Sequence, residues 1–123
     1  MEDKKLDKIK KLGTLINKER KDKGLSLRDF AKMVGISHVA ISHIEKGKVE
    51  AKKDTLLNIA RVLKYDVDAM LAKASRLDDD IEDLIFEKSN QVPQFLRTAK
   101  NLSEEQWKQI TEQVKKMNKS NDE

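Results

Sequence analysis

Apolar residues recur at every third or fourth position along most of the chain, and polar residues fill the positions between them. This spacing is typical of helices with one buried face. Five apolar residues so spaced predict a first helix over residues 6–22: Leu6, Ile9, Leu12, Leu15 and Ile16. Four more predict a short second helix: Leu27, Phe30, Ala31 and Val34. Lys23-Gly24 ends the first helix and Gly35 ends the second, because glycine commonly ends helices.

Small polar residues mark the starts of the helices. Ser26 and Ser37 are favourable N-caps for the second helix and for a third that runs to about Lys46. Asp54 is the expected N-cap of a fourth helix and Asp66 that of a fifth. The basic segment GKVEAKK, between the third and fourth helices, is expected to be a loop.

The second half of the chain continues the helical pattern. In DDDIEDLIFEK three acids favour a helix N-terminus, and Pro93 suits the first turn of the next helix. Ser103-Glu-Glu-Gln106 is a capping box that opens a final amphipathic helix. We therefore predict an all-α protein with a domain over residues 6–74, a helical segment over 75–118 and a disordered tail over 119–123.

Composition and charge narrow the functional class. The 123 residues include no cysteine, which excludes disulfides and thiolate metal sites and fits a reducing cytoplasm. No stretch approaches the roughly 18 apolar residues of a membrane span, so a cytoplasmic protein without a membrane partner is expected. Residues 1–74 hold 18 Lys and Arg against 11 Asp and Glu, and the remainder hold 8 against 11. This asymmetry suggests a basic working end and a neutral-to-acidic partner end, although such runs are also common on solvated surfaces.

The second and third helices meet at a tight turn around Gly35 and so form a helix-turn-helix. Ala31 is small where the two helices cross, and glycine permits the positive φ that a sharp turn requires. On the third helix Ile41 and Ile44 face inward, which leaves both histidines of the chain, His38 and His43, facing outward. Five residues apart, they lack the i, i+4 spacing of a helical ligand pair, so no metal site is expected. An exposed face with two imidazoles favours base contact in a DNA major groove.

From about Leu12 to Leu71 the sequence resembles the lambda-repressor-like, or XRE, family of helix-turn-helix regulators. The residues that carry the resemblance include Lys23-Gly24-Leu25-Ser26, Phe30-Ala31, Gly35-Ile36-Ser37, Ile41-Ser42, Ile44-Glu45-Lys46-Gly47, Thr55-Leu56, Ile59-Ala60, Leu63 and Val67. The resemblance implies a compact five-helix DNA-binding domain. It also implies a sequence-specific transcriptional regulator, a repressor of the kind encoded on mobile elements, with double-stranded DNA as its partner and no cofactor.

The resemblance also assigns roles to single residues. Four are expected to meet base edges: His38, Val39, Ser42 and His43. Six are expected near phosphates: Arg28, Ser37, Lys46, Lys48, Lys52 and Lys53. Arg20 and Glu45 match positions that form an ion pair between the first and third helices. Two positions depart from the family pattern, because Leu27 stands where glutamine is common and Ala51 where proline is common.

The apolar stripes of the second half are expected to form a dimer interface. They comprise Leu84, Ile85, Phe95, Leu96, Trp107, Ile110 and Val114. Packing back onto the first domain is the alternative for these stripes. The segment from Val92 to Arg97 resembles the tail of mobile-element repressors that are cut by a dedicated metallopeptidase, so such a peptidase or an anti-repressor protein is a candidate partner.

A different class of function is a protein-binding module of the antitoxin type, which masks a partner protein and represses its own operon. An enzyme is not expected, because the sequence holds no paired-carboxylate signal, nucleophile motif or glycine-rich phosphate loop. A neighbouring toxin gene or a co-purifying small protein would favour the interpretation as an antitoxin over that as a repressor.

Overall fold

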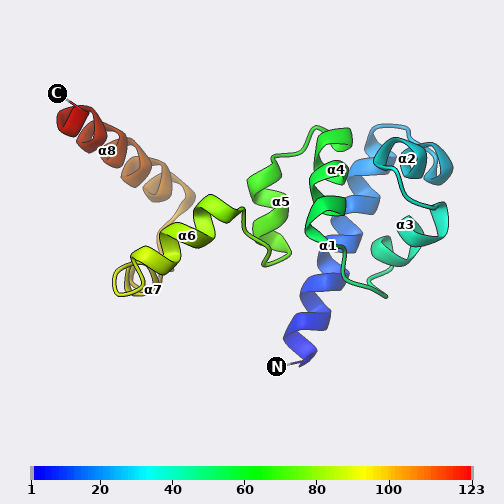
Figure 1. Cartoon of the computed structure of the whole chain (residues 1–123), viewed down its shortest axis with the longest axis horizontal. Helices are drawn as coiled ribbons and strands as arrows, with labels where there is room; N and C mark the ends of the chain where they lie inside the picture. The colour runs from blue at the N-terminus through cyan, green and yellow to red at the C-terminus, as the bar shows by residue number, and fades with distance from the viewer. Residues whose placement is uncertain (1, 123) are drawn as a thin grey trace. The chain divides into compact units, whose positions relative to one another are not determined.

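A computed structural model describes residues 2–122, and every regular element in that range is an α-helix. The helices are α1 (Glu2–Asp22), α2 (Leu27–Val34), α3 (His38–Glu45), α4 (Lys53–Leu63), α5 (Val67–Lys73), α6 (Asp79–Glu87), α7 (Val92–Ala99) and α8 (Glu104–Asp122). Figure 1 follows this order from the N-terminus to the C-terminus. The predicted all-α class is confirmed. Within the described range no helix is long and apolar enough to cross a membrane.

The chain separates into two compact units, one ending at Ile81 and one beginning at Glu82. In the first unit α1 packs against α3 and α4, and α2 contacts both α3 and α4 (Figure 1). Helix α5 closes the core from the side of α4. The fully buried side chains at its centre are Ile16, Phe30, Ile41, Leu56, Ile59, Leu63, Met70 and Leu71. Each of the first five helices therefore contributes to one core, as expected of a lambda-repressor-like domain.

The caps explain why several helices start where they do. The Ser26 hydroxyl accepts a hydrogen bond from the Asp29 amide, and Asp66 accepts one from the Ala69 amide. Such bonds satisfy backbone donors that have no partner inside the helix. Gly24 has a φ of 69°, a conformation that glycine adopts without a steric cost, and it follows the end of α1. These predicted start and stop residues are confirmed.

The start of α4 differs from the prediction. Its N-cap is Lys52, which makes no side-chain capping bond, and Asp54 lies inside the first turn. A carboxylate there still favours the helix, because the first turn carries the positive end of the helix dipole. Asp54 therefore has a favourable position, but it is not the N-cap.

The second unit is held together by few contacts. The rings of Phe95 and Trp107 meet edge to face with centroids 6.3 Å apart. The predicted capping box is present, since the Ser103 hydroxyl accepts from the Gln106 amide and the Gln106 side chain accepts from the Ser103 amide. Among the helices α6 to α8, Ala99 is the one buried residue in the described range. Helix α8 extends to Asp122, so residues 119–122 are helical where a disordered tail was expected.

Candidate nucleic-acid interface

The turn between α2 and α3 fixes the direction of the third helix. Gly35 has a φ of 93°, and its amide donates to the Ala31 carbonyl at 2.8 Å. This conformation is strained for any residue with a Cβ, which explains the glycine. Two residues later the Ser37 hydroxyl caps α3 by accepting from the Ala40 amide at 3.1 Å. The chain therefore stops one helix and starts the next within three residues.

Helix α3 has a buried side and an open side. Ile41 is fully buried and Ile44 nearly so, and both belong to the core of the first unit. Ala31 on α2 is also buried, where its small side chain lets α2 and α3 approach. The opposite side of α3 presents the four residues predicted to meet base edges. His38 and Val39 are exposed, and Ser42 and His43 are half-buried.

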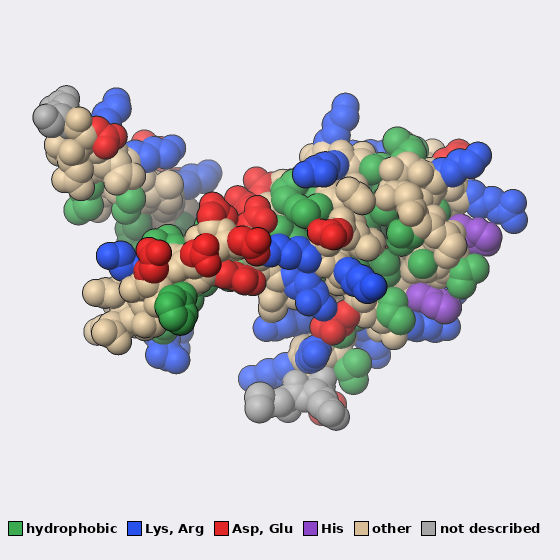
Figure 2. All heavy atoms as spheres, viewed as in Figure 1, with side chains coloured by type: hydrophobic (Ala, Val, Ile, Leu, Met, Phe, Trp, Pro, Cys, Tyr) green, Lys and Arg blue, Asp and Glu red, His purple; other side chains and the backbone are tan. Residues whose placement is uncertain are grey.

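The two histidines are at the surface of the first unit. Figure 2 shows both imidazoles there, with lysine and arginine side chains nearby. Within residues 2–122, no group of three or more His, Asp and Glu side chains is arranged to hold a metal ion. Imidazole can donate to or accept from a base edge, so the surface position suits recognition.

A buried ion pair ties α3 to α1. Arg20 donates through Nε to Glu45 Oε2 at 2.8 Å and through Nη2 to Glu45 Oε1 at 3.0 Å. Asn17 adds a bond of 2.7 Å to Glu45 Oε1, and Arg20 Nη1 donates to the Leu25 carbonyl at 2.9 Å. Both charged side chains are at most 10% exposed. The pair that the family resemblance implied is thus present, and its two parallel bonds fix the orientation of α3 more rigidly than a surface pair would.

Gly13 is a determinant of the interface that the sequence analysis missed. It lies in the middle of α1, where the backbones of α1 and α3 come together. A Cβ added at Gly13 would lie 2.4 Å from the Ile44 carbonyl oxygen and 2.6 Å from that of Glu45. Only glycine allows this approach. Glycine is less favourable than alanine in a helix interior by about 1 kcal/mol. A glycine within a predicted helix was therefore the one feature of the sequence that could have indicated this contact.

The cationic residues expected near phosphates come from three segments. Arg28 is exposed on the first turn of α2, Lys46 and Lys48 are exposed after α3, and Lys52 is exposed before α4. Lys53 is half-buried and forms an ion pair of 3.0 Å with Asp79. Gly47, with a φ of 71°, turns the chain between the first two of these lysines beside Lys10 of α1. Lys10 is therefore a further cation next to this loop, and it was not predicted.

Comparisons with known proteins agree with this geometry. A family model described as Helix-turn-helix matches residues 16–70. The ImmF control region 10 kDa protein of Bacillus phage phi105 is 38% identical over 61 residues, which cover 50% of this chain and 68% of that protein. The chain belongs to the lambda-repressor-like helix-turn-helix family of DNA-binding transcription regulators.

Solved structures extend the comparison to the fold. An HTH_3 family transcriptional regulator from Vibrio cholerae is 28% identical with a TM-score of 0.50, over 55% of this chain and 38% of that one. The clp gene regulator ClgR from Corynebacterium glutamicum is 22% identical with a TM-score of 0.50, over 75% of this chain and 93% of that one. The second likeness supports the fold alone.

The two departures from the helix-turn-helix family pattern have structural roles here. Leu27, where glutamine is common, is half-buried and packs against the core. Ala51, where proline is common, is buried, and its carbonyl accepts a hydrogen bond of 3.2 Å from Arg76 Nε. Arg28, the neighbour of Leu27, remains exposed and can supply charge. The loop after α3 is therefore fixed by a contact to Arg76 rather than by a proline ring.

The residues predicted to form a dimer interface lie on α6, α7 and α8. Leu84, Phe95, Leu96 and Val114 are each about half exposed, at 47–50%. Ile85, Trp107 and Ile110 are half-buried. Phe86, which was not among the predicted residues, is 84% exposed. We call the seven predicted residues the apolar stripe; large exposed apolar side chains of this kind mark interaction surfaces when they are contiguous.

Proposed function

We propose that this protein is a dimeric repressor that binds a palindromic operator, with α3 lying in the major groove. The observation that carries the proposal is the combination of a buried Arg20–Glu45 pair and an open outer face on the same helix. The pair fixes the orientation of α3, and the open face leaves its outer side chains available to bases. A rigid reading helix is what base recognition requires, because each bidentate contact tolerates little displacement.

The outer face of α3 supplies a mixed set of base contacts. His38 and His43 can donate to purine N7 or O6 atoms, and the Ser42 hydroxyl can donate or accept. Val39, which is 52% exposed, can contact a thymine methyl group. Residues near the start of the helix enter the groove first, so His38 and Val39 would read different base pairs from Ser42 and His43.

The surrounding cations would position the domain on the DNA backbone. The cations that would contact phosphates without reading bases precede and follow α3 in the sequence: Arg28 lies before it, and Lys46, Lys48, Lys52 and Lys53 lie after it. The Ser37 hydroxyl accepts the capping bond from Ala40, and its own hydrogen remains able to donate to a phosphate. Only the five cations displace counterions, and together they would reduce affinity by roughly 500-fold between 50 and 200 mM salt.

A dimer would follow from the apolar stripe. Two domains related by a twofold axis would reach half-sites about 34 Å apart, one turn of DNA. The exposed Phe95, Leu96 and Val114 would lose contact with water in the interface. The name of the phage relative connects that protein to a control region. This supports repression within such a region as the role of the present chain.

The apolar stripe also supports a second candidate function. A different protein could cover the same residues, as in an antitoxin that masks its partner and represses its own operon. An anti-repressor or a metallopeptidase acting on the second unit would use the same surface. The two functions predict different masses in solution, because the repressor forms a dimer on its own, whereas the masking module assembles only with its partner.

Selection of bound fragments from a random DNA pool tests the main proposal. The full chain is incubated with the pool at low salt, and the bound fragments are sequenced. A repressor of the proposed kind enriches an inverted repeat with half-sites one turn apart, and its affinity falls steeply as salt is added. Enrichment of a single half-site would remove the dimer from the proposal, and failure to enrich any sequence would favour the masking function.

A further inference from the structure

A groove behind α3 has the composition of a small-molecule site. Its volume is about 360 Å³, and it is lined by the first turns of α1, by the loop after α3 and by residues 73–76. Apolar groups line its interior, among them Ile9 and Leu12 from α1, Ile44 from the last turn of α3, and Val49 and Ala51 from the loop. Ligand pockets in proteins range from about 300 to 1,000 Å³ and are mostly apolar, so this groove falls at the small end of that range.

The rim of the groove is strongly cationic. Five of the lining residues carry a positive charge: Lys4, Lys5, Lys8, Lys73 and Arg76. Among the described residues that line the groove, Glu50 is the one carboxylate. Its Oε2 atom lies 3.6 Å from Lys5 Nζ and 3.7 Å from Arg76 Nη2. Charge-assisted hydrogen bonds are normally 2.7–2.9 Å long, so both contacts are loose.

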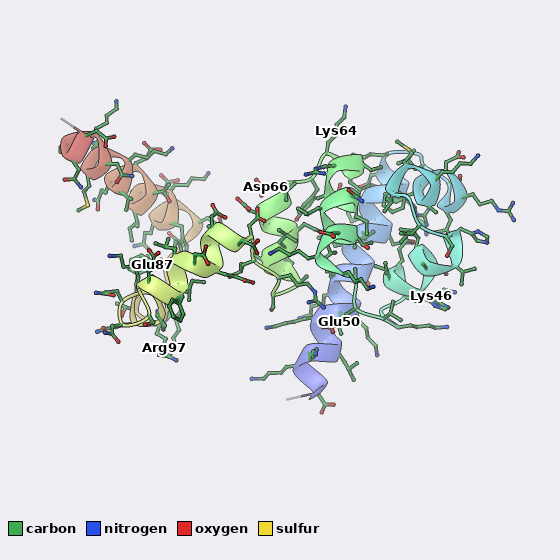
Figure 3. All side chains as sticks on the ribbon, in the orientation of Figure 1. Lys46, Glu50, Lys64, Asp66, Glu87 and Arg97 are labelled. Atoms are coloured by element: carbon green, nitrogen blue, oxygen red, sulfur yellow. The ribbon has the colours of Figure 1, made fainter. Side chains whose placement is uncertain are left out.

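We propose that this groove binds a small amphipathic anion, an organic carboxylate with an alkyl or aryl body. The apolar body would lie against Ile9, Ile44 and Val49, and the carboxylate would take the position between Lys5 and Arg76 that Glu50 now occupies loosely. Five cations against one carboxylate give this lining a net positive charge that attracts such an anion, whereas a wholly apolar ligand would make no use of that charge. Figure 3 shows Glu50 beside the N-terminal half of α1.

The position of the groove connects the ligand to α3. Ile44 lines the groove and belongs to the last turn of α3, next to the backbone contact with Gly13. Arg76 lines it as well, and its Nε holds the Ala51 carbonyl and with it the loop that carries Lys46, Lys48 and Lys52. A ligand carboxylate that competes for Arg76 would loosen this loop and release the charge of Glu50 beside it.

Both effects reduce the attraction between this loop and phosphates, so the anion would weaken DNA binding. This consequence rests on the proposed function, whereas occupancy of the groove does not. Linkage requires that DNA weaken the binding of the anion by the same factor. The groove would then be the site at which an organic carboxylate with an alkyl or aryl body relieves repression.

Amide chemical-shift mapping of the full chain with sodium decanoate tests the site without DNA. The expected result is saturable shifts at Gly13, Val49 and Ser75, below the concentration at which decanoate forms micelles. Glu50→Gln removes the competing carboxylate and should tighten binding up to about fivefold, which corresponds to about 1 kcal/mol. Val49→Asp adds a negative charge to the groove and should weaken binding about tenfold or more.

Lys64→Gln is the matched control, because Lys64 follows α4 whereas Glu50 precedes it and lines the groove. It should bind decanoate like the unmodified chain. Shifts confined to the apolar stripe, or equal affinities for all three variants, would overturn the proposal. So would shifts of the groove amides that grow with protein concentration alone, since they would show that a second copy occupies the groove. Decanoate binding without any effect on DNA affinity would leave the site standing and remove its regulatory role.

Discussion

Replacement of Gly13 by alanine would set local helix preference against the packing of α1 on α3. Alanine is favoured over glycine in a helix interior by about 1 kcal/mol, so an isolated α1 would become more helical. In the folded protein the new methyl group would lie 2.4 Å from the Ile44 carbonyl oxygen, whereas ordinary contacts begin at about 3.4 Å. The two helices must therefore separate locally by about 1 Å.

The separation has an energetic cost that the structure helps to bound. Overpacking of a well-packed contact typically costs about 1–3 kcal/mol, and here the obstructing atoms are backbone and cannot rotate away. The bonds of 2.8 and 3.0 Å between Arg20 and Glu45 hold α3 next to the same contact and would lengthen as the helices part. After the gain in helix preference, we expect a net loss of up to about 2 kcal/mol in the free energy of unfolding.

DNA binding should respond more strongly than stability. A shift of about 1 Å in α3 misaligns every base contact at once, so the preference for the selected operator over random DNA should fall at least about tenfold. Urea unfolding followed by circular dichroism gives the stability, and fluorescence anisotropy with labelled duplexes gives the two affinities.

Gly24→Ala is the control for replacing a glycine where the new methyl group contacts no other helix. Gly24 has a φ of 69° and no atom within 4 Å of an added Cβ, so this change costs about 1–2 kcal/mol of backbone strain without moving α3. It should lower stability and leave operator preference intact. The opposite outcome is that Gly13→Ala raises stability by about 1 kcal/mol and keeps the operator preference. Helix preference alone would then explain the gain in stability, and the close approach of α1 and α3 at Gly13 would be refuted.

Four further changes separate the roles assigned to other residues. His43→Ala should reduce the sequence preference at one base pair by about 1–3 kcal/mol in competition binding. An unchanged preference would mean that His43 makes no base contact from the outer face of α3. Lys48→Ala should weaken all duplexes about equally and reduce the slope of log affinity against log salt by about 1, whereas a sequence-dependent loss would argue for a base contact. Glu45→Ala leaves Arg20 buried without its carboxylate and should lower the free energy of unfolding in urea by about 3–5 kcal/mol. The double variant Arg20→Met, Glu45→Leu should recover most of that stability, and a failure to recover it would mean that the ion pair itself stabilises the fold. Leu96→Glu should give a monomer by light scattering, and an unmodified chain that is itself monomeric would remove the dimer.

Short-range features were the part of the fold that the sequence could predict. Ser26, Ser37 and Ser103 cap helices by accepting hydrogen bonds from residues three positions away. A stretch of four residues is therefore enough to predict each cap. The positive φ of Gly35 follows from the same local logic. Asp54 failed as a cap because aspartate is equally favourable in the first turn, and composition alone does not separate the two positions.

Long-range contacts were less predictable. Gly13 contacts residues at the end of α3, and nothing in its neighbourhood along the chain marks that approach. Asn17 and Arg76 likewise bond to partners far away in the sequence, Glu45 and the Ala51 carbonyl. The Arg20–Glu45 pair was anticipated only through family resemblance. The outer face of α3 followed from helical periodicity, because burial of Ile41 and Ile44 determines which residues lie opposite.

The proposed function requires that the outer face of α3 contact base edges. It is tested most directly by mapping amide shifts in the full chain as the duplex enriched from the random pool is added. We expect the largest shifts at His38, Val39, Ser42 and His43, and we expect a scrambled duplex to perturb the flanking lysine segments but not these four. Shifts confined to the second unit, or equal shifts of these four with both duplexes, would contradict it.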